Sequence, residues 1–402
     1  MPDLTSAELD ARDPLAGFRD HFAGAEDGVI AYLDGNSLGR PVLGTADRLA
    51  GLVEEAWGRR LIRSWDDAWM DEPTVLGDRI GEVVLGAAAG QTVVGDSTSV
   101  LLYKLIRAAV DSDPSRTEVV LDRANFPTDR YLVQGIAAER GLTLRWLDVD
   151  HAGGVEPGPL AEVLSERTAL VVLSHVAYRS GFLADAGEIT RLAHAVGALV
   201  LWDLSHSVGS VPVQLDAWGV DLAVGCTYKY LNGGPGSPAF CYVRAGLQDR
   251  LQQPVWGWMG ADDPFTMGPD YQPAVGIRRF LTGTPPITAM QPMRLMLDLI
   301  ADAGMDAVRR KSVLLTEHAV QLSDERLAPY GVLLASPRDP DRRGSHVTVD
   351  HPAFREVCAE LWRRGVIPDF RAPNGIRLGL SPLSTTFAEL ETGIDAIADL
   401  LV

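Results

Sequence analysis

Two short apolar runs in the middle of the chain each lead to a charged residue, and this feature constrains the fold most. The first, Ala198–Trp202, stops at Asp203, and the second, Leu222–Val224, is closely followed by Tyr228 and Lys229. Short apolar runs are typical of buried parallel strands, and open α/β sheets bind their ligands at the carboxyl ends of the strands. The pattern therefore predicts an acid and a lysine facing one pocket.

Strands and helices alternate around these two runs. We expect strands at 118–121, 142–147, 169–174 and 239–243, and helices at 98–109, 128–140, 157–164 and 185–196. Such alternation indicates an α/β fold with a mostly parallel, doubly wound sheet that carries helices on both faces.

The pattern changes after residue 286. One long helical region, 289–322, precedes strands and helices that are typical of a smaller C-terminal α/β domain. We expect three parts: an N-terminal segment (1–50) that packs with the small domain, a large domain (51–286) and the small domain (287–402).

Composition narrows the classes of function. The chain has 402 residues and a formal net charge of -18, which disfavours binding to nucleic acid or to a membrane surface. The three cysteines, Cys226, Cys241 and Cys358, have neither the spacing of a disulfide framework nor that of a metal knuckle. We expect a cytoplasmic protein without a metal site.

Asp203 and Lys229 suit one kind of chemistry in particular. A partly desolvated lysine can form a Schiff base, and an acid on a neighbouring strand end can keep a heterocyclic nitrogen protonated. This is the arrangement that binds pyridoxal 5'-phosphate. A structural ion pair explains the two residues equally well.

Other segments offer parts of a binding site, each with an ordinary structural alternative. Asp96-Ser97-Thr98-Ser99 could bind a phosphate at a helix start or simply cap that helix. Phe126 could stack on a flat ring or serve as a hydrophobic staple. His206 could reach a phosphate or be a satisfied buried histidine. Arg377, entering an apolar strand, needs a carboxylate from a substrate or, more commonly, from the protein.

Three loop-like segments complete the set. Trp65–Trp69 is aromatic, and the glycine-broken stretches Trp256–Gly260 and Thr282–Pro286 fit either a pocket rim or ordinary surface turns.

Taken in order, these pieces resemble kynureninases, which are fold-type I pyridoxal phosphate enzymes of the class V aminotransferase superfamily. The motifs that carry the resemblance span nearly the whole chain. They are Leu33-Asp34-Gly35-Asn36-Ser37-Leu38-Gly39, Asn125-Phe126-Pro127-Thr128-Asp129, Trp202-Asp203-Leu204-Ser205-His206-Ser207-Val208-Gly209, Cys226-Thr227-Tyr228-Lys229-Tyr230-Leu231-Asn232-Gly233-Gly234-Pro235-Gly236, Gly257-Trp258-Met259-Gly260 and Pro373-Asn374-Gly375-Ile376-Arg377.

The resemblance implies a role for each matching position. Lys229 would bind the cofactor and move the substrate's α-proton, Asp203 would pair with the pyridine nitrogen, and Tyr228 would donate or relay a proton. Arg377 would bind the α-carboxylate, with Asn36 and Trp65 also at the substrate. The implied cofactor-binding residues are Ser97, Thr98, Phe126, Asp129, Ser174, Asp203, His206, Tyr228, Lys229, Trp258 and Thr284. Of these, Trp258 and Thr284 would reach the cofactor of a neighbouring subunit, which implies a homodimer.

The implied reaction is hydrolysis of the Cβ–Cγ bond of L-kynurenine, or of a 3-hydroxy or otherwise substituted kynurenine, to anthranilate or its derivative and L-alanine. Ala261 stands where the resemblance leads us to expect a histidine, which leaves the aryl substituent open. Two alternatives remain: another class V enzyme, such as a cysteine desulfurase, selenocysteine lyase or epimerase, and a catalytically silent binding protein on the same fold.

Overall fold

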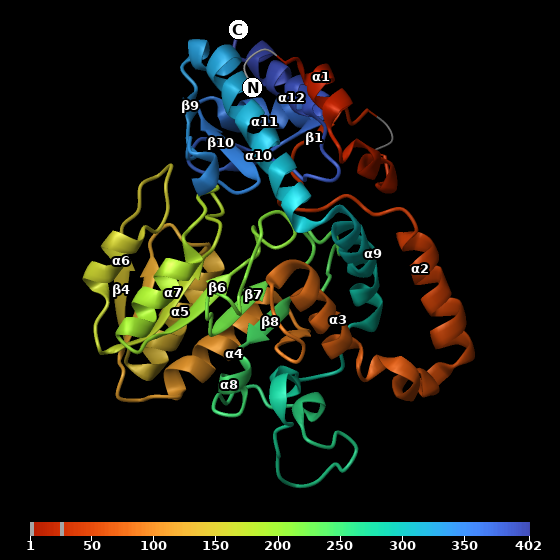
Figure 1. Cartoon of the computed structure of the whole chain (residues 1–402), viewed down its shortest axis with the longest axis vertical. Coiled ribbons are helices and arrows are strands. Elements are labelled where there is room, and N and C mark those ends of the chain that lie inside the picture. The colour runs from red at the N-terminus through yellow and green to blue at the C-terminus, as the bar shows by residue number, and fades with distance from the viewer. Residues whose placement is uncertain (1–3, 25–27) are drawn as a thin grey trace.

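The computed structural model describes residues 4–24 and 28–402, arranged as a large lower domain and a smaller upper one (Figure 1). The expected N-terminal segment, 1–50, therefore lies in part, at 1–3 and 25–27, outside the described residues. Within the described ranges, no helix is both long and apolar enough to cross a membrane.

The large domain is built on a seven-stranded sheet with the order β2-β8-β7-β6-β5-β3-β4. Strands β4, β3, β5, β6 and β7 run parallel, and β8 is antiparallel to both of its neighbours. The strands are β2 (Thr92–Val94), β3 (Glu118–Asp122), β4 (Thr143–Leu147), β5 (Thr168–Ser174), β6 (Leu199–Asp203), β7 (Leu222–Gly225) and β8 (Phe240–Val243). The chain order reverses between β3 and β5, and such a switch point leaves a crevice at the carboxyl ends of the strands.

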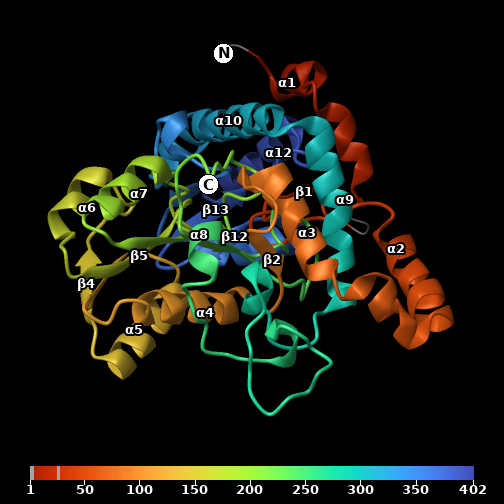
Figure 2. The same ribbon diagram turned by 60° about the horizontal axis from the view of Figure 1, so that its bottom comes forward.

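Helices cover both faces of this sheet, as the apolar runs predict. Successive residues of a strand point to opposite faces. Val171 and Leu173 accordingly belong to a core cluster with α6, α7 and α9, whereas Leu170 and Val172 belong to one with α4 and α5. Figure 2 shows the two helix layers on either side of the sheet. The helical elements of this domain are α3 (Glu72–Ile80), η5 (Gly81–Leu85), α4 (Thr98–Asp111), α5 (Pro127–Arg140), α6 (Pro157–Val163), α7 (Ala186–Ala195), α8 (Ala245–Gln248), η6 (Trp258–Gly260), η7 (Gly276–Phe280) and α9 (Ile287–Ala303).

The small domain contains an antiparallel sheet of order β12-β13-β10-β9 and a parallel pair formed by β1 and β11. Its strands are β1 (Ala31–Tyr32), β9 (Leu333–Leu334), β10 (His346–Asp350), β11 (Val366–Ile367), β12 (Asp369–Arg371) and β13 (Gly375–Gly379). Its helical elements are α1 (Ser6–Arg12), η1 (Ala16–His21), α10 (Met305–Leu322), η8 (Ser323–Leu327), η9 (Ala328–Tyr330), η10 (Pro340–Arg342), α11 (Phe354–Arg363) and α12 (Phe387–Asp399).

N-terminal residues contribute to this small domain. Strand β1 pairs with β11, and the Asp10 carboxylate accepts a hydrogen bond from the Phe387 backbone N–H at 2.8 Å, at the start of α12. Lys311 of α10 forms an ion pair with Asp13 at 2.6 Å.

The expected helical region 289–322 is two helices. Gly304, with φ of +76°, separates α9 from α10, because this backbone conformation ends a helix and suits glycine. Apolar side chains of α9, including Met293 and Leu297, pack into the core of the large domain. The boundary expected after residue 286 stays a prediction.

An arm projects from the body of the molecule. It consists of α2 (Thr45–Gly51), η2 (Leu52–Arg59), η3 (Leu61–Arg63) and η4 (Trp65–Trp69) (Figure 1). The prediction of a loop at Trp65–Trp69 is wrong, because this stretch is helical. An ion pair between Arg60 and Asp67 at 2.7 Å and an edge-to-face contact between Trp65 and Trp69 stabilise this end of the arm.

Candidate functional site

Four parallel strands deliver the predicted residues to one edge of the sheet. Ser174 and Asp203 are the last residues of β5 and β6 and lie opposite each other in register. Phe126 follows β3 at the start of α5, and Lys229 comes shortly after β7. This edge is the carboxyl edge next to the switch point, where a ligand is expected.

Lys229 differs from the other two lysines of the chain. Lys104 is held by Asp96 at 2.5 Å, and Lys311 is held by Asp13 at 2.6 Å. Among the described residues no carboxylate pairs with Lys229, whose Nζ lies 3.1 Å from His206 Nε2 and 5.9 Å from the ring centre of Phe126. Burial lowers the pKa of Lys229, which favours the neutral amine that a Schiff base requires.

Two buried acids lie beside this lysine. Asp203 accepts a hydrogen bond from the Ser205 N–H at 2.8 Å. Asp129 is 1% exposed, and neither of its carboxylate oxygens has a hydrogen-bond partner among the described residues. Burial raises the pKa of Asp129 well above its usual range, and the nearby charge of Asp203 adds to that rise. A cationic N–H donor placed beside the two acids would give Asp129 a hydrogen-bond partner and would offset the repulsion between the two carboxylates.

His206 and Tyr228 complete the surroundings of Lys229. Burial lowers the pKa of His206 far below its usual value, and the charge of Lys229 lowers it further, so the imidazole is neutral. The pKa of Tyr228 is raised, first by the neighbouring Cys226 and then by burial, so this hydroxyl keeps its proton. A neutral phenol near the lysine can donate a proton or a hydrogen bond.

The expected phosphate site lies at the start of α4. Ser97 is the N-cap and accepts from the Val100 N–H at 3.4 Å, and Thr98 is the first helical residue. Ser97 is exposed and Thr98 is half-buried. The hydroxyls and the free N–H groups of the first turn are therefore open to an anion.

Arg377 reaches the same region from the small domain. It lies on β13, is 1% exposed, and donates to the Tyr178 carbonyl at 2.7 Å and to Ser37 Oγ at 2.9 Å. With its amide oriented for hydrogen bonding, Asn36 accepts from Arg377 Nε at 2.9 Å. Asp369, opposite Arg377 on β12, forms an ion pair with it at 2.6 Å and adds a negative partner. The structure thus brings Asn36 and Arg377 together.

Three predicted residues lie apart from Lys229. Trp258 begins η6, between α8 and α9 in the chain; it is 38% exposed and makes an edge-to-face contact with Phe265. Thr284 is exposed in the loop before α9, and Trp65 lies on the projecting arm. None of the three has a hydrogen bond or ring contact with Lys229 in the part of the chain that the structure describes.

Several site residues were missed by the sequence reasoning. His346 is fully buried, with its ring 5.6 Å from that of His206 and with both ring nitrogens unpartnered in the described structure. Asp369 and Arg371 lie on β12, where Asp369 is directly opposite Arg377 of β13, and the alternation Asp-x-Arg opposite an arginine is the signal that could have found them. Gly39 packs against the backbone of Lys229.

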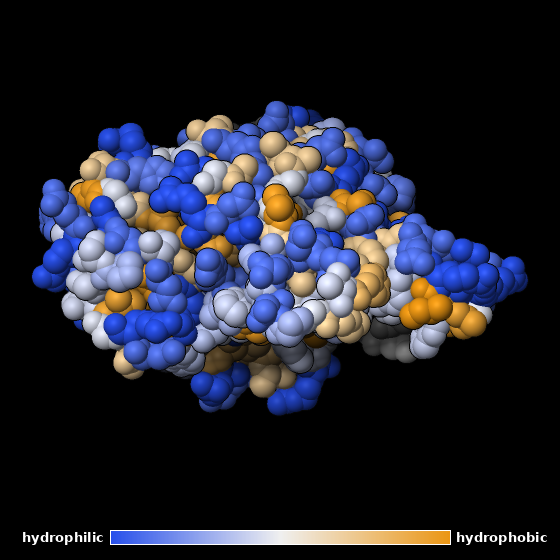
Figure 3. Space-filling view, turned by 90° about the horizontal axis from the view of Figure 1, so that it is seen from below, coloured by the Kyte–Doolittle hydropathy of each residue, from blue (hydrophilic) through white to orange (hydrophobic). Residues whose placement is uncertain are grey.

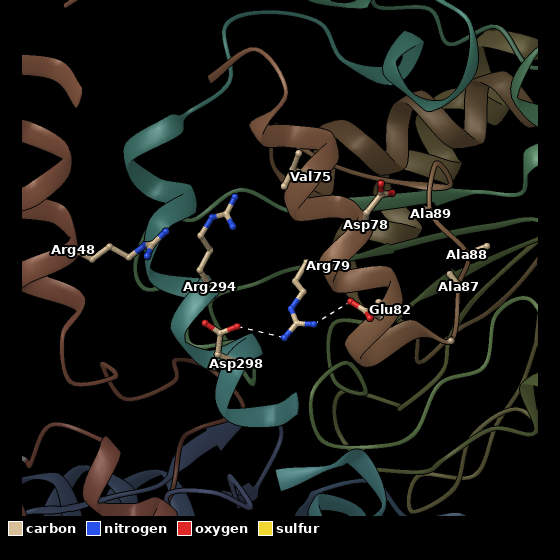
Figure 4. A pocket seen from close by; sticks show the side chains of 11 residues that line it. Arg48, Val75, Asp78, Arg79, Glu82, Ala87, Ala88, Ala89, Arg294 and Asp298 are labelled. Carbon is tan, nitrogen blue, oxygen red and sulfur yellow. Dashed lines mark hydrogen bonds and ion pairs between the residues drawn. The ribbon is translucent and has the colours of Figure 1, made fainter. Parts of the chain in front are cut away.

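A separate cavity of about 860 Å³ opens between the arm, α3 and α9 (Figure 4). Its arginines contact neighbouring acids: Arg79 lies between Glu82 and Asp298, at 3.0 and 3.4 Å. None of the predicted site residues lines it. In the described ranges, no group of histidine, cysteine and acidic side chains is arranged to hold a metal ion.

Comparisons with known proteins show which family the chain belongs to. Residues 308–397 match the family model of the kynureninase C-terminal domain. The chain is 44% identical over 401 residues to the kynureninase of Pseudomonas fluorescens, covering 98% of this chain and 94% of that protein. It is 43% identical over 400 residues to the kynureninase of Burkholderia pseudomallei strain 1106a, with the same coverage.

Solved structures with low identity show the fold. The apo cysteine desulfurase of Thermococcus onnurineus NA1 matches with a TM-score of 0.81 at 18% identity, over 100% of this chain and 99% of that chain. A lysine-to-alanine mutant of C-DES, with glycine covalently linked to its PLP cofactor, matches with a TM-score of 0.84 at 18% identity, over 95% and 99%. The fold-type I prediction is confirmed, and the chain belongs to the kynureninase family.

Proposed function

We propose that this chain uses pyridoxal 5'-phosphate to hydrolyse the Cβ–Cγ bond of L-kynurenine, giving anthranilate and L-alanine. Family membership supports the reaction. The observation that carries it is the desolvated Lys229, which has no carboxylate partner among the described residues, beside the buried acids Asp203 and Asp129. One water is consumed for each bond broken, so the atoms balance.

The residues present fit this cofactor. The two unpartnered oxygens of Asp129, with Asp203 next to them, can hold a proton on a pyridine nitrogen. Phe126 offers an aromatic face near Lys229 Nζ, and Ser97 and Thr98 offer hydroxyls and backbone N–H groups to a phosphate. When bound, pyridoxal phosphate withdraws electrons from the α-carbon of an amino acid.

Each side chain then has a task. Lys229 takes the proton from the α-carbon at Nζ, because its lowered pKa leaves part of it as a base. Asp203 and Asp129 would hold a proton on the ring nitrogen of the cofactor. Arg377 orients the substrate through its carboxylate, with Asn36 beside it. Tyr228 would donate its retained proton to the β-carbon of the substrate as the carbon–carbon bond breaks, and would recover it from water.

Incubation with L-kynurenine and with 3-hydroxykynurenine tests the proposal. Fluorescence of anthranilate or 3-hydroxyanthranilate reports the product, and the Lys229→Ala variant is the control that should give none. Ala261 stands where the family resemblance leads us to expect a histidine, which leaves the aryl substituent open, so both substrates are compared. Absence of product from both would contradict the substrate assignment.

The likeness to cysteine desulfurases does not extend to their chemistry. All three cysteines are buried: Cys358 lies in α11, Cys241 lies in β8 and Cys226 follows β7. Burial raises the pKa of Cys241 to about 12 and that of Cys358 to about 11, which disfavours a reactive thiolate. A C–C hydrolase therefore fits these residues better.

We also propose that the protein is a homodimer with shared active sites. The arm carries exposed apolar side chains, namely Val53, Trp57, Leu61 and Ile62, and apolar residues interrupt the mostly hydrophilic face in Figure 3. Trp258 and Thr284, which lie apart from their own Lys229, could then reach a partner's site. Light scattering measures the mass, and recovery of activity on mixing Lys229→Ala with Trp258→Ala tests the sharing.

Two further assignments complete the proposal. The reaction would serve tryptophan catabolism, or a related branch leading to NAD or to a substituted anthranilate. Three free thiols are usual in a reducing compartment, which supports a cytoplasmic location that cell fractionation can test.

A further inference from the structure

The ion pair between Arg377 and Asp369 occupies the guanidinium that we expect to bind the substrate. The two residues face each other across the β12–β13 pair, and Arg377 Nη2 lies 2.6 Å from Asp369 Oδ2. The Arg377 side chain is 1% exposed and that of Asp369 is 15% exposed. A buried guanidinium needs a negative partner, and here the protein supplies it.

The remaining donors of Arg377 also have partners. Nη1 donates to the Tyr178 carbonyl at 2.7 Å, Nη2 donates to Ser37 Oγ at 2.9 Å, and Nε donates to Asn36 at 2.9 Å. These three partners are neutral, so Asp369 is the carboxylate that pairs with Arg377. A ligand carboxylate would therefore find the guanidinium already neutralised, and it must replace a partner to form a bidentate contact.

Asp369 also forms an ion pair with a second arginine, Arg371. Arg371, two residues along the same strand, places Nη2 2.8 Å from the same oxygen, Asp369 Oδ2. The Arg371 side chain is 35% exposed, and its Nε has no hydrogen-bond partner among the described residues. Asp369 can therefore leave Arg377 without losing its ion pair, because Arg371 keeps a free donor for it.

We propose that Asp369 is a positioning residue that pairs with Arg377 when no ligand is bound. When the substrate binds, Asp369 releases Arg377 to the α-carboxylate of the substrate and pairs with Arg371 alone. Asp369 thereby sets the affinity of the site for amino acids with a free carboxylate. The same competition assists release of L-alanine. This inference rests on the proposed function, since that function assigns the α-carboxylate to Arg377.

The test compares two ligands on the holoenzyme: L-alanine, and L-alaninamide, which lacks the carboxylate. Dissociation constants are measured by titration of the visible absorbance of the cofactor and by calorimetry. In Asp369→Asn, L-alanine should bind roughly three- to tenfold tighter, the effect of one charge pair that is not fully buried. L-Alaninamide should bind as it does to the wild type.

Asp350→Asn is the matched control. Asp350 lies on the neighbouring strand β10, is similarly buried, and pairs with an arginine, Arg179, at 2.9 Å. It should leave both dissociation constants unchanged. In Arg371→Gln, displaced Asp369 loses its second partner, so L-alanine should bind severalfold more weakly and L-alaninamide should not change.

Unchanged or weaker L-alanine binding in Asp369→Asn would overturn the role of Asp369, and equal weakening of both ligands would show a structural role only. The proposed function fails separately. If the wild type releases no anthranilate from L-kynurenine, or if Arg377→Met still prefers L-alanine to L-alaninamide, then the reaction or the role of Arg377 is wrong.

Discussion

Replacing Gly39 with alanine tests how the N-terminal turn supports the catalytic lysine. The Gly39 N–H donates to the Tyr228 carbonyl at 2.8 Å, and a Cβ at Gly39 would lie 2.4 Å from the Lys229 carbonyl oxygen. Since non-bonded heavy atoms settle at about 3.5 Å, the lysine loop must move by roughly 1 Å. Overpacking of this kind costs about 1–3 kcal/mol of the free energy of unfolding.

A displacement of about 1 Å at a catalytic group can cost roughly a hundredfold in rate. We therefore expect Gly39→Ala to lower kcat/KM for L-kynurenine by about tenfold to a hundredfold, measured by anthranilate fluorescence. Urea unfolding and the visible absorbance of the cofactor report stability and loading. Gly51→Ala is the control, because a Cβ there meets nothing within 4 Å. A Gly39→Ala enzyme with kcat/KM within about twofold of the wild type and unchanged stability would refute this reasoning.

Three further predictions concern single side chains. Burial lowers the pKa of His175 to about 3. Below pH ~6.5 the unfolded state therefore binds a proton at this residue that the folded state does not bind. As a result, the free energy of unfolding falls by about 1.4 kcal/mol for each pH unit of acidification. His175→Phe should flatten the decline by that amount in urea unfolding between pH ~6.5 and ~4.5, and equal slopes would contradict the shift. Phe126→Leu should raise the dissociation constant of pyridoxal phosphate about three- to tenfold in equilibrium dialysis, because stacking is lost; unchanged affinity would exclude stacking. Tyr228→Phe should keep the cofactor band but lower kcat by about 10²-fold or more, and an unaffected kcat would remove Tyr228 from the proton transfer.

The sequence predicts best those features that depend on local pattern. Strand β6 and its terminal Asp203, and strand β7 with Lys229 shortly after it, follow from short apolar runs in a parallel sheet. The break at Gly304 was missed because both flanking helices continue the same apolar spacing. Helical Trp65–Trp69 was missed because its aromatic and acidic residues show no apolar stripe.

Strand register and contacts between distant segments were beyond prediction for a different reason. The pairing of Asp369 with Arg377 depends on the register of two short antiparallel strands. His346 meets His206 only because strand β10 of the small domain reaches the strand ends of the large one. Neither contact leaves a periodic signal in the sequence, because the residues involved are far apart or lie in strands of three to five residues.

Lys229 is the residue that we expect to carry the cofactor, and because the chain has only three lysines this can be measured directly. The protein is incubated with pyridoxal phosphate, reduced with borohydride to make a Schiff base permanent, and digested for peptide mass spectrometry. We expect the phosphopyridoxyl group on Lys229, with Lys104 and Lys311 unmodified because carboxylates hold them. A modification on Lys104 or Lys311, or none on Lys229, would contradict it.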